Sequence, residues 1–115
     1  SEPLFIHQEI PMKTLVTSLI LAAAALSAVA KDVIIDVRTP AEFAADHIAG
    51  AINIDHEVIA RDIAQAGVGK NDRVILYCRS GRRSGIAMNT LKTMGYSKAE
   101  NVGGIEQARK ALSIK

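Results

Sequence analysis

After residue 31, the apolar residues of the predicted strands gather into four short runs, separated by polar or glycine-containing segments. The runs at 32–37 and 74–77 are almost uninterrupted, which is typical of strands buried on both faces of a parallel sheet. Two shorter runs, at 50–54 and 99–102, predict two further strands.

Four helices are expected between and after these strands. The clearest start signal is the capping-box pattern of Thr39 and Glu42, with Pro40 at the first helical position. The predicted ranges are 40–46, 57–66, 84–94 and the segment from Gly103-Gly104 to about Leu112. Strands that alternate with helices of about ten residues predict an α/β domain with a mostly parallel sheet.

The apolar segment before residue 31 has a different character. Met12-Lys13 gives a short positive start, Leu15–Leu26 is almost entirely apolar, and Ala28-Val29-Ala30 fits a small-x-small cleavage site. This pattern predicts that residues 12–30 are a secretory signal peptide. The alternative is a buried core helix, but the segment has no polar face of the kind that packing helices present to solvent.

The predicted signal peptide divides the chain into three parts. Residues 1–11 precede a plausible initiator methionine and are interpreted as vector-derived sequence or a misassigned start. Residues 31–115 are then one exported domain, which we expect in the periplasm and away from the membrane once the signal is cleaved.

The composition limits the classes of partner. The chain of 115 residues holds one domain at most, and its formal net charge is only +2. Aromatic residues make up 3% of it and no nucleic-acid-reading motif is present, so we expect no nucleic-acid partner. Three arginines instead gather directly after the only cysteine, which suits a small anion.

Cys78, that only cysteine, opens the sequence Cys-Arg-Ser-Gly-Arg-Arg-Ser at 78–84. A predicted strand leads into it and a predicted helix leads out, so the thiol is expected in a short loop at a helix N-terminus. Converging backbone N–H groups, the helix dipole and the charges of Arg79, Arg82 and Arg83 would all favour an anion there. We therefore expect a thiol that is largely ionised at neutral pH.

The competing interpretation of Cys78 is a buried structural residue that behaves as a small hydrophobe. An exported chain with one cysteine has no internal disulfide, so an unpaired thiol there needs another use. The three arginines cannot all be buried at low cost, which predicts a loop at the surface. A thiol buried away from solvent would count against the enzyme interpretation.

Three blocks of this sequence resemble the single-domain rhodanese family, and in particular its small periplasmic phage-shock-type members. The blocks are Asp-Val-Arg-Thr-Pro-Ala-Glu-Phe at 36–43, His-Ile-Ala-Gly-Ala-Ile-Asn-Ile at 47–54, and the cysteine loop followed by Met94-Gly95-Tyr96. The resemblance covers essentially all of 32–104 and implies a rhodanese-like α/β fold, a small parallel sheet flanked by helices.

The resemblance also implies a thiosulfate sulfurtransferase with a ping-pong mechanism. Cys78 would take sulfane sulfur from thiosulfate or a similar anionic donor, hold it as a persulfide, and pass it to cyanide or a thiol acceptor. No metal and no organic cofactor is expected, and we expect a monomer.

The loop residues are the expected substrate-binding residues. Its backbone amides from Ser80 to Ser84 would form the anion cradle, with Gly81 supplying backbone freedom. The full expected set after the nucleophile is Arg79, Ser80, Gly81, Arg82, Arg83 and Ser84.

Residues outside the loop receive supporting roles. Asp36 and Arg38 are expected to brace the edge of the sheet as an ion pair rather than to act in catalysis. Glu42 is interpreted first as a helix cap, and the resemblance adds a pairing with an arginine.

Two other functions stay open at this point. A cysteine-dependent phosphatase or arsenate reductase also holds a thiolate in an anion cradle, but its Cys-x5-Arg spacing would place arginine where Ser84 stands. The nearest arginine fit is Cys-x4-Arg, at Arg83. The second alternative is a rhodanese module used for sulfur relay or protein contact.

Some positions depart from the family pattern. Asp46 stands where glycine is frequent, Asp55 where proline is common, and Ile105 near a frequent tryptophan, so the shape of the rim is open. His47 is interpreted as a structural hydrogen-bonding residue. His47 and His56 have no partner cysteine, which makes a zinc site improbable.

Overall fold

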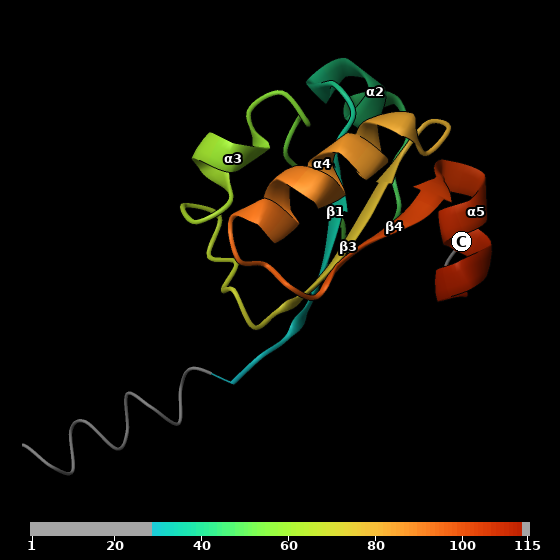
Figure 1. The fold of residues 1–115 in the computed structure, drawn as a ribbon. Coiled ribbons are helices and arrows are strands. Elements are labelled where there is room, and N and C mark those ends of the chain that lie inside the picture. The colour runs from blue at the N-terminus through green and yellow to red at the C-terminus, as the bar shows by residue number, and fades with distance from the viewer. Residues whose placement is uncertain (1–28, 114–115) are drawn as a thin grey trace, which may run out of the picture.

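The computed structural model describes residues 29–113, whose centre is a four-stranded sheet (Figure 1). All neighbouring strands pair in parallel, in the order β2-β1-β3-β4. The strands are β1 (Asp32–Asp36), β2 (Ile52–Asn53), β3 (Arg73–Cys78) and β4 (Ala99–Gly104). The helices are α2 (Pro40–Ala45), α3 (Ile59–Asp62), α4 (Arg82–Thr93) and α5 (Ile105–Leu112). The predicted α/β class with a parallel sheet is confirmed.

Alternate side chains of β3 enter two separate hydrophobic clusters, because successive residues of a strand point to opposite faces. Val74 and Leu76 pack in the larger cluster, to which α4 contributes Ala87 and Leu91. Tyr77 packs in the smaller cluster, with Ile48, Ala108 of α5 and partly buried neighbours. The central strand is therefore covered on both faces, as its uninterrupted apolar sequence predicts.

The capping box that opens α2 is present as predicted. The Thr39 hydroxyl accepts a hydrogen bond from the Glu42 backbone N–H, and the Glu42 carboxylate accepts one from the Thr39 N–H, both at 3.3 Å. Pro40 occupies the first helical turn, where its missing N–H costs no hydrogen bond. The helix ends one residue earlier than predicted.

The predicted helix at 57–66 is wrong in its length. Only the four residues of α3 are helical, and the start at Val58 has no capping side chain. Beyond it, the Gly67 N–H bonds the Ala64 carbonyl, three residues back, and Gly67 adopts φ 82°. A tight turn thus replaces the last helical turns, although Ile59 and Ile63 are buried as the apolar spacing requires.

The predicted strand at 50–54 is also shorter than expected. β2 has two residues because it is an edge strand that pairs only with the end of β1, through Ile35–Ile52 and Asp36–Asn53.

An irregularity in the pairing of β3 with β4 shapes the carboxyl end of the sheet. Leu76 pairs with Asn101, but Cys78 pairs with Gly104, so β4 holds one extra residue over this interval. Such a bulge bends the strand locally and is frequent beside active sites. Here it includes Gly103 at φ 96° and brings Gly104 opposite the cysteine.

The predicted signal peptide lies almost entirely outside the described residues and stays a prediction. Among the helices of residues 29–113, none has the length and apolar character needed to cross a membrane.

Candidate active site

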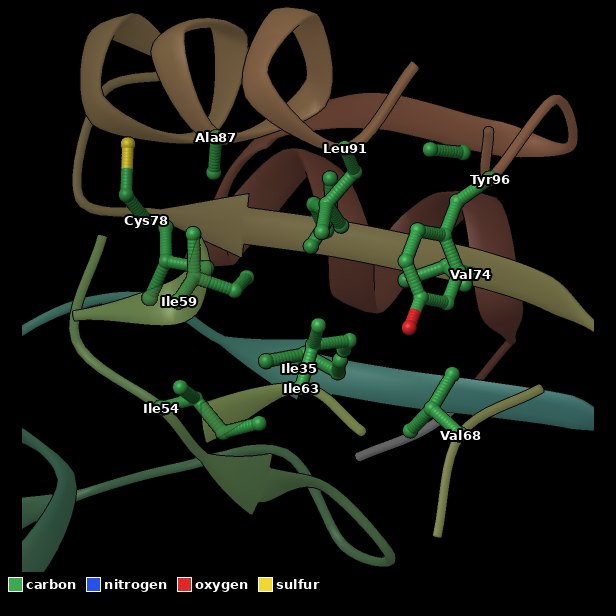
Figure 2. Close-up of a cluster of buried hydrophobic side chains, with 13 residues drawn as sticks. Ile35, Ile54, Ile59, Ile63, Val68, Val74, Cys78, Ala87, Leu91 and Tyr96 are labelled. Atoms are coloured by element: carbon green, nitrogen blue, oxygen red, sulfur yellow. The ribbon is translucent and has the colours of Figure 1, made fainter. Parts of the chain in front are cut away.

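The predicted site residues meet at the carboxyl ends of the parallel strands. Cys78 is the last residue of β3, Asp36 the last of β1 and Gly104 the last of β4. In open parallel sheets this edge is where ligands bind, since loops from several strands converge there. Figure 2 shows Cys78 at the end of its strand, its sulfur directed toward α4.

The loop after Cys78 closes a cradle around the sulfur. The Gly81 backbone N–H donates to Cys78 Sγ at 2.9 Å, and Ser84 Oγ lies 3.3 Å from the same sulfur. Gly81 adopts φ 99°, in the left-handed region that favours glycine. A Cβ added at Gly81 would lie 3.2 Å from the Cα of Gly103, so the loop also needs glycine for this close approach to β4.

The N-terminus of α4 has no cap of its own. The helix begins at Arg82, two residues earlier than predicted, so Arg82 and Arg83 stand in its first turn, without an acidic residue. Gly81 at the cap position provides no side-chain hydrogen bond. Unsatisfied N–H groups and positive charge at a helix N-terminus together form a site suited to an anion.

The expected exposure of the thiol is wrong. Arg79, Ser80 and Arg82 are exposed, as a surface loop requires, but Cys78 has 0% exposure and belongs to the larger hydrophobic cluster. The reason is the pleat of β3, which points Cys78 toward α4 like Leu76, while the loop's own backbone folds over the sulfur. The sulfur is thus covered by an exposed loop, although it was expected to be open to solvent.

The pKa of Cys78 is nevertheless lowered. Burial raises the pKa, but hydrogen bonds from the Ser84 hydroxyl and from the backbone N–H groups of Ser84, Ser80 and Gly81 outweigh burial. The expectation that every nearby contribution favours the anion is therefore wrong in one respect, because desolvation opposes it. The dominant favourable contributions come from hydroxyl and amide groups rather than from the three arginines.

The three arginines differ in their surroundings. Arg83 forms a two-pronged ion pair with Glu42, with distances of 2.8 and 2.9 Å between the guanidinium and carboxylate. Arg79 and Arg82 are exposed, and within residues 29–113 neither forms an ion pair. Within residues 29–113, the positive charge at the rim that is not paired with a carboxylate thus comes from Arg79 and Arg82, while Glu42 holds the Arg83 guanidinium.

Asp36 and Arg38 form a buried ion pair below this rim. The Arg38 guanidinium donates to Asp36 at 2.7 Å and also to the Asp46 carbonyl. It lies over the Tyr77 ring, 5.8 Å from the centroid. Asn53 donates to the carbonyls of both ion-pair partners at 3.0 Å. This arrangement joins β1, β2 and β3 and fits the bracing role, and within residues 29–113 neither partner forms a hydrogen bond with the sulfur.

The Tyr77 side chain lies on the opposite face of β3 from Cys78, in the smaller hydrophobic cluster. Its hydroxyl oxygen accepts a hydrogen bond from the Ile48 N–H at 3.0 Å. Burial raises the pKa of Tyr77 to about 12, so the phenol stays neutral at ordinary pH.

Asn101 is a site residue that the sequence analysis missed. Its side chain contacts the Ser84 hydroxyl at 2.7 Å, the Gly81 carbonyl at 2.9 Å and the Gly103 N–H at 2.9 Å. No local motif identifies it, because Ser84 and Gly81 are 17 and 20 residues away. The available sequence signal was the Gly103-Gly104 pair, because glycines in a strand indicate a close approach of another backbone. In the structure, a Cβ on Gly104 would collide with the Arg79 carbonyl.

The departures from the family pattern lie around the site. Asp46 has φ −168°, extended backbone that any residue adopts, and its carboxylate pairs with Arg109 of α5 at 2.8 Å. The Asp55 carboxylate accepts from the Glu57 N–H at 3.0 Å and lies 3.1 Å from a ring nitrogen of His56.

Ile105 and His47 are accommodated by local packing. Ile105 packs against the smaller hydrophobic cluster. The His47 ring stacks on Phe43, and its Nδ1 lies 2.8 Å from the Phe43 carbonyl oxygen. In residues 29–113, no three His, Cys, Asp or Glu side chains are grouped as metal ligands would be.

Comparison with known proteins places this geometry in a family. The rhodanese-like domain family matches residues 21–111. The chain belongs to that family. Thiosulfate sulfurtransferase PspE of Escherichia coli is 46% identical over 72 residues, which are 63% of this chain and 69% of PspE. A sulfurtransferase of Allochromatium vinosum is 37% identical over 83 residues, 70% of this chain and 76% of the relative. A rhodanese from E. coli solved with anions superposes with a TM-score of 0.63 at 43% identity, over 66% of this chain and 89% of that chain.

The Glu42–Arg83 ion pair makes a prediction about acid stability. Arg83 lowers the pKa of Glu42 from 4.5 to about 2, with further hydrogen bonds from Thr39. A depressed carboxylate pKa stabilises the fold above the unfolded-state value, and this contribution is lost as the pH falls toward 2. Glu42→Gln keeps a capping side chain but removes the charge, and should lower the free energy of unfolding near neutral pH by about 1 kcal/mol.

Urea unfolding of both proteins between pH 7 and pH 2 measures this difference. It should shrink through the interval from 4.5 to 2, while Glu57→Gln, at an exposed glutamate, should show little difference throughout. A Glu42→Gln difference that is as large at pH 2 as at pH 7 would contradict the ion-pair explanation.

Proposed function

We propose that this rhodanese-family chain is a thiosulfate sulfurtransferase in which Cys78 is the nucleophile and the carrier of the transferred sulfur. The observation that supports this most strongly is the hydrogen-bonded sulfur at the uncapped N-terminus of α4. A relative that covers much of the domain at 46% identity is a thiosulfate sulfurtransferase. A related E. coli rhodanese was solved with anions.

The reaction consists of two displacements at sulfur. The Cys78 thiolate attacks the outer sulfur of thiosulfate, a new S–S bond forms, and sulfite leaves with the electron pair of the broken S–S bond. A nucleophilic acceptor, cyanide or a thiolate, then attacks the outer sulfur of the persulfide, and Cys78 leaves as thiolate. Atoms and charge balance without an oxidant, a reductant or a metal.

The cradle contributes to both displacements. The N–H groups that hold the thiolate would also stabilise the negative charge of a persulfide formed on the same sulfur. Exposed Arg79 and Arg82 would offset the repulsion between a thiolate and a dianionic donor. Arg83 would act through its charge at a fixed position, since Glu42 holds its guanidinium.

The burial of Cys78, which was expected to count against an enzyme, instead adds a condition to this mechanism, because hydrogen bonds still lower the pKa of the covered thiol. Thiosulfate must contact the sulfur directly, so the 79–81 backbone or the Cys78 side chain must shift when the donor arrives. The exclusion of water around the sulfur strengthens each hydrogen bond to the anion. It also protects a persulfide from unspecific nucleophiles.

The alternatives are less well supported by the site. A phosphatase cradle needs an arginine free to bind two phosphoryl oxygens, whereas Arg83 already uses its two terminal nitrogens on Glu42. Sulfur relay to a protein acceptor uses the same persulfide and differs only in the second displacement. We further propose a periplasmic location, which the signal-like segment at 12–30 supports.

Persulfide formation provides the direct test of this function. After thiosulfate treatment and removal of the donor, the intact mass should rise by one sulfur atom and return to its original value with a reductant or cyanide. Cys78→Ser should show neither the added mass nor thiosulfate:cyanide transfer above background. An adduct that forms on Cys78→Ser, or transfer that persists, would contradict the proposal.

The rim arginines make a separate prediction about donor use. Arg82→Ala should lower kcat/KM for thiosulfate by about fivefold, because one charge near a dianion contributes about 1 kcal/mol in partly screened surroundings. The effect should weaken with rising salt. Arg61→Ala, at an exposed arginine of α3, is the matched control and should leave kcat/KM unchanged. Equal values for the two variants would remove Arg82 from donor binding.

A further inference from the structure

We propose that Asn101 is a positioning residue that holds the single hydroxyl proton of Ser84 away from Cys78 and so restrains the thiol from giving up its proton. The proposal rests on the proposed role of Cys78 as nucleophile. It assigns to β4 a part in tuning that nucleophile.

The orientation of the Asn101 amide is fixed by two backbone groups. The Gly103 N–H can only donate, and it lies 2.9 Å from Asn101 Oδ1. The Gly81 carbonyl can only accept, and it lies 2.9 Å from Asn101 Nδ2. Reversing the amide would set donor against donor and acceptor against acceptor, so Oδ1 must be the atom that faces Ser84.

This orientation determines the use of the Ser84 proton. Ser84 Oγ lies 2.7 Å from Asn101 Oδ1, 3.1 Å from the Gly81 carbonyl and 3.3 Å from Cys78 Sγ. A hydroxyl has one proton, and its shortest contact is with an oxygen that only accepts. Ser84 therefore donates to Asn101 and turns a lone pair toward the sulfur, where a protonated thiol can donate S–H to it.

Ionisation of the thiol reverses this arrangement. When the Cys78 proton leaves to solvent, the Ser84 hydroxyl stabilises the thiolate only if its proton turns from Asn101 to the sulfur. That turn leaves two oxygens, Ser84 Oγ and Asn101 Oδ1, 2.7 Å apart with no proton between them. Asn101 therefore opposes ionisation, while the loop amides favour it.

The charged groups around the sulfur do not account for this effect. Arg83 of α4 interacts with the Cys78 charge, with Glu42 of α2 and with Asp55 after β2. Arg79 and Arg82 are the remaining charges of the loop. All five stay in place when Asn101 is replaced by a neutral residue, so their contribution cancels in the comparison.

The test is the pH profile of Cys78 alkylation by iodoacetamide, for which Asn101→Leu removes the acceptor at nearly constant size. In Asn101→Leu, the midpoint of this pH profile should fall by about 0.5–1 pH unit. This is equivalent to about three- to tenfold more thiolate at a pH well below the midpoint. Asn71→Leu, at an exposed asparagine beyond the opposite end of the sheet, should keep the wild-type midpoint. In a Ser84→Ala background, Asn101→Leu should produce no further shift.

An unchanged or higher midpoint in Asn101→Leu, or an equal shift with and without Ser84, would overturn the proposal. The midpoint reports ionisation and the plateau rate reports access to the thiol, so a purely structural effect would move only the plateau.

If Asn101→Leu does not fold, Asn101→Asp replaces it. Asp should raise the midpoint more in the presence of Ser84 than in Ser84→Ala, and equal shifts would overturn the proposal. Alkylation needs no sulfur donor, so a failure of sulfur transfer is distinguishable from a failure of this inference.

Discussion

A sulfur anion that is taken out of water must find hydrogen-bond donors in the protein, or it will take up a proton instead. Cys78 meets this constraint at the end of β3, where burial raises its pKa and the hydrogen bonds from Ser84, Ser80 and Gly81 lower it by more. The Ser84 N–H is available because α4 begins without a side-chain cap, so its first N–H groups have no partner within the helix, and the Ser80 and Gly81 N–H groups come from the loop that precedes it. The first turn of α4 thus has N–H groups without partners in the helix, and the sulfur of Cys78 accepts a hydrogen bond from one of them, the Ser84 N–H.

The rest of the sheet edge keeps this arrangement in place. The bulge in β4 brings Gly103 close to Gly81, and it brings Gly104 so close to the Arg79 carbonyl that a Cβ on Gly104 would collide with it. On the other side, the ion pair of Asp36 and Arg38 anchors the end of β1. Glu42 holds Arg83 beside the first turn of α4. Contacts from β4, and from α2 through Glu42, thus fix a loop that by sequence alone is rich in serine and charge.

Local sequence predicts most of the fold and part of the site. The strand that ends at Cys78, the loop and the following helix are each specified by neighbouring residues, and so is the capping box of Thr39 and Glu42. These features are predictable because a strand, a cap or a glycine turn depends on contacts within a few residues.

The features that sequence analysis missed depend on contacts between distant residues. The burial of Cys78 follows from which face of β3 points toward α4, and the role of Asn101 depends on a register shift between two strands. The helix at 57–66 is shorter than its apolar spacing predicts, because Ile59 and Ile63 are already buried when the chain turns at Gly67. Periodicity identifies which side chains are buried, but it does not say how many helical turns are needed to bury them.

The central claim, that hydrogen bonds outweigh burial at Cys78, is tested most directly by titrating the thiol itself. The ultraviolet absorbance of the thiolate, followed against pH with Cys78→Ser as the blank, gives its pKa in the folded protein. The expected pKa lies below the ordinary 9.0 of a cysteine thiol, and unfolding in urea should move the transition back up toward that ordinary value. A folded-state pKa at or above that value would show that desolvation dominates, and the cradle would then not hold an anion.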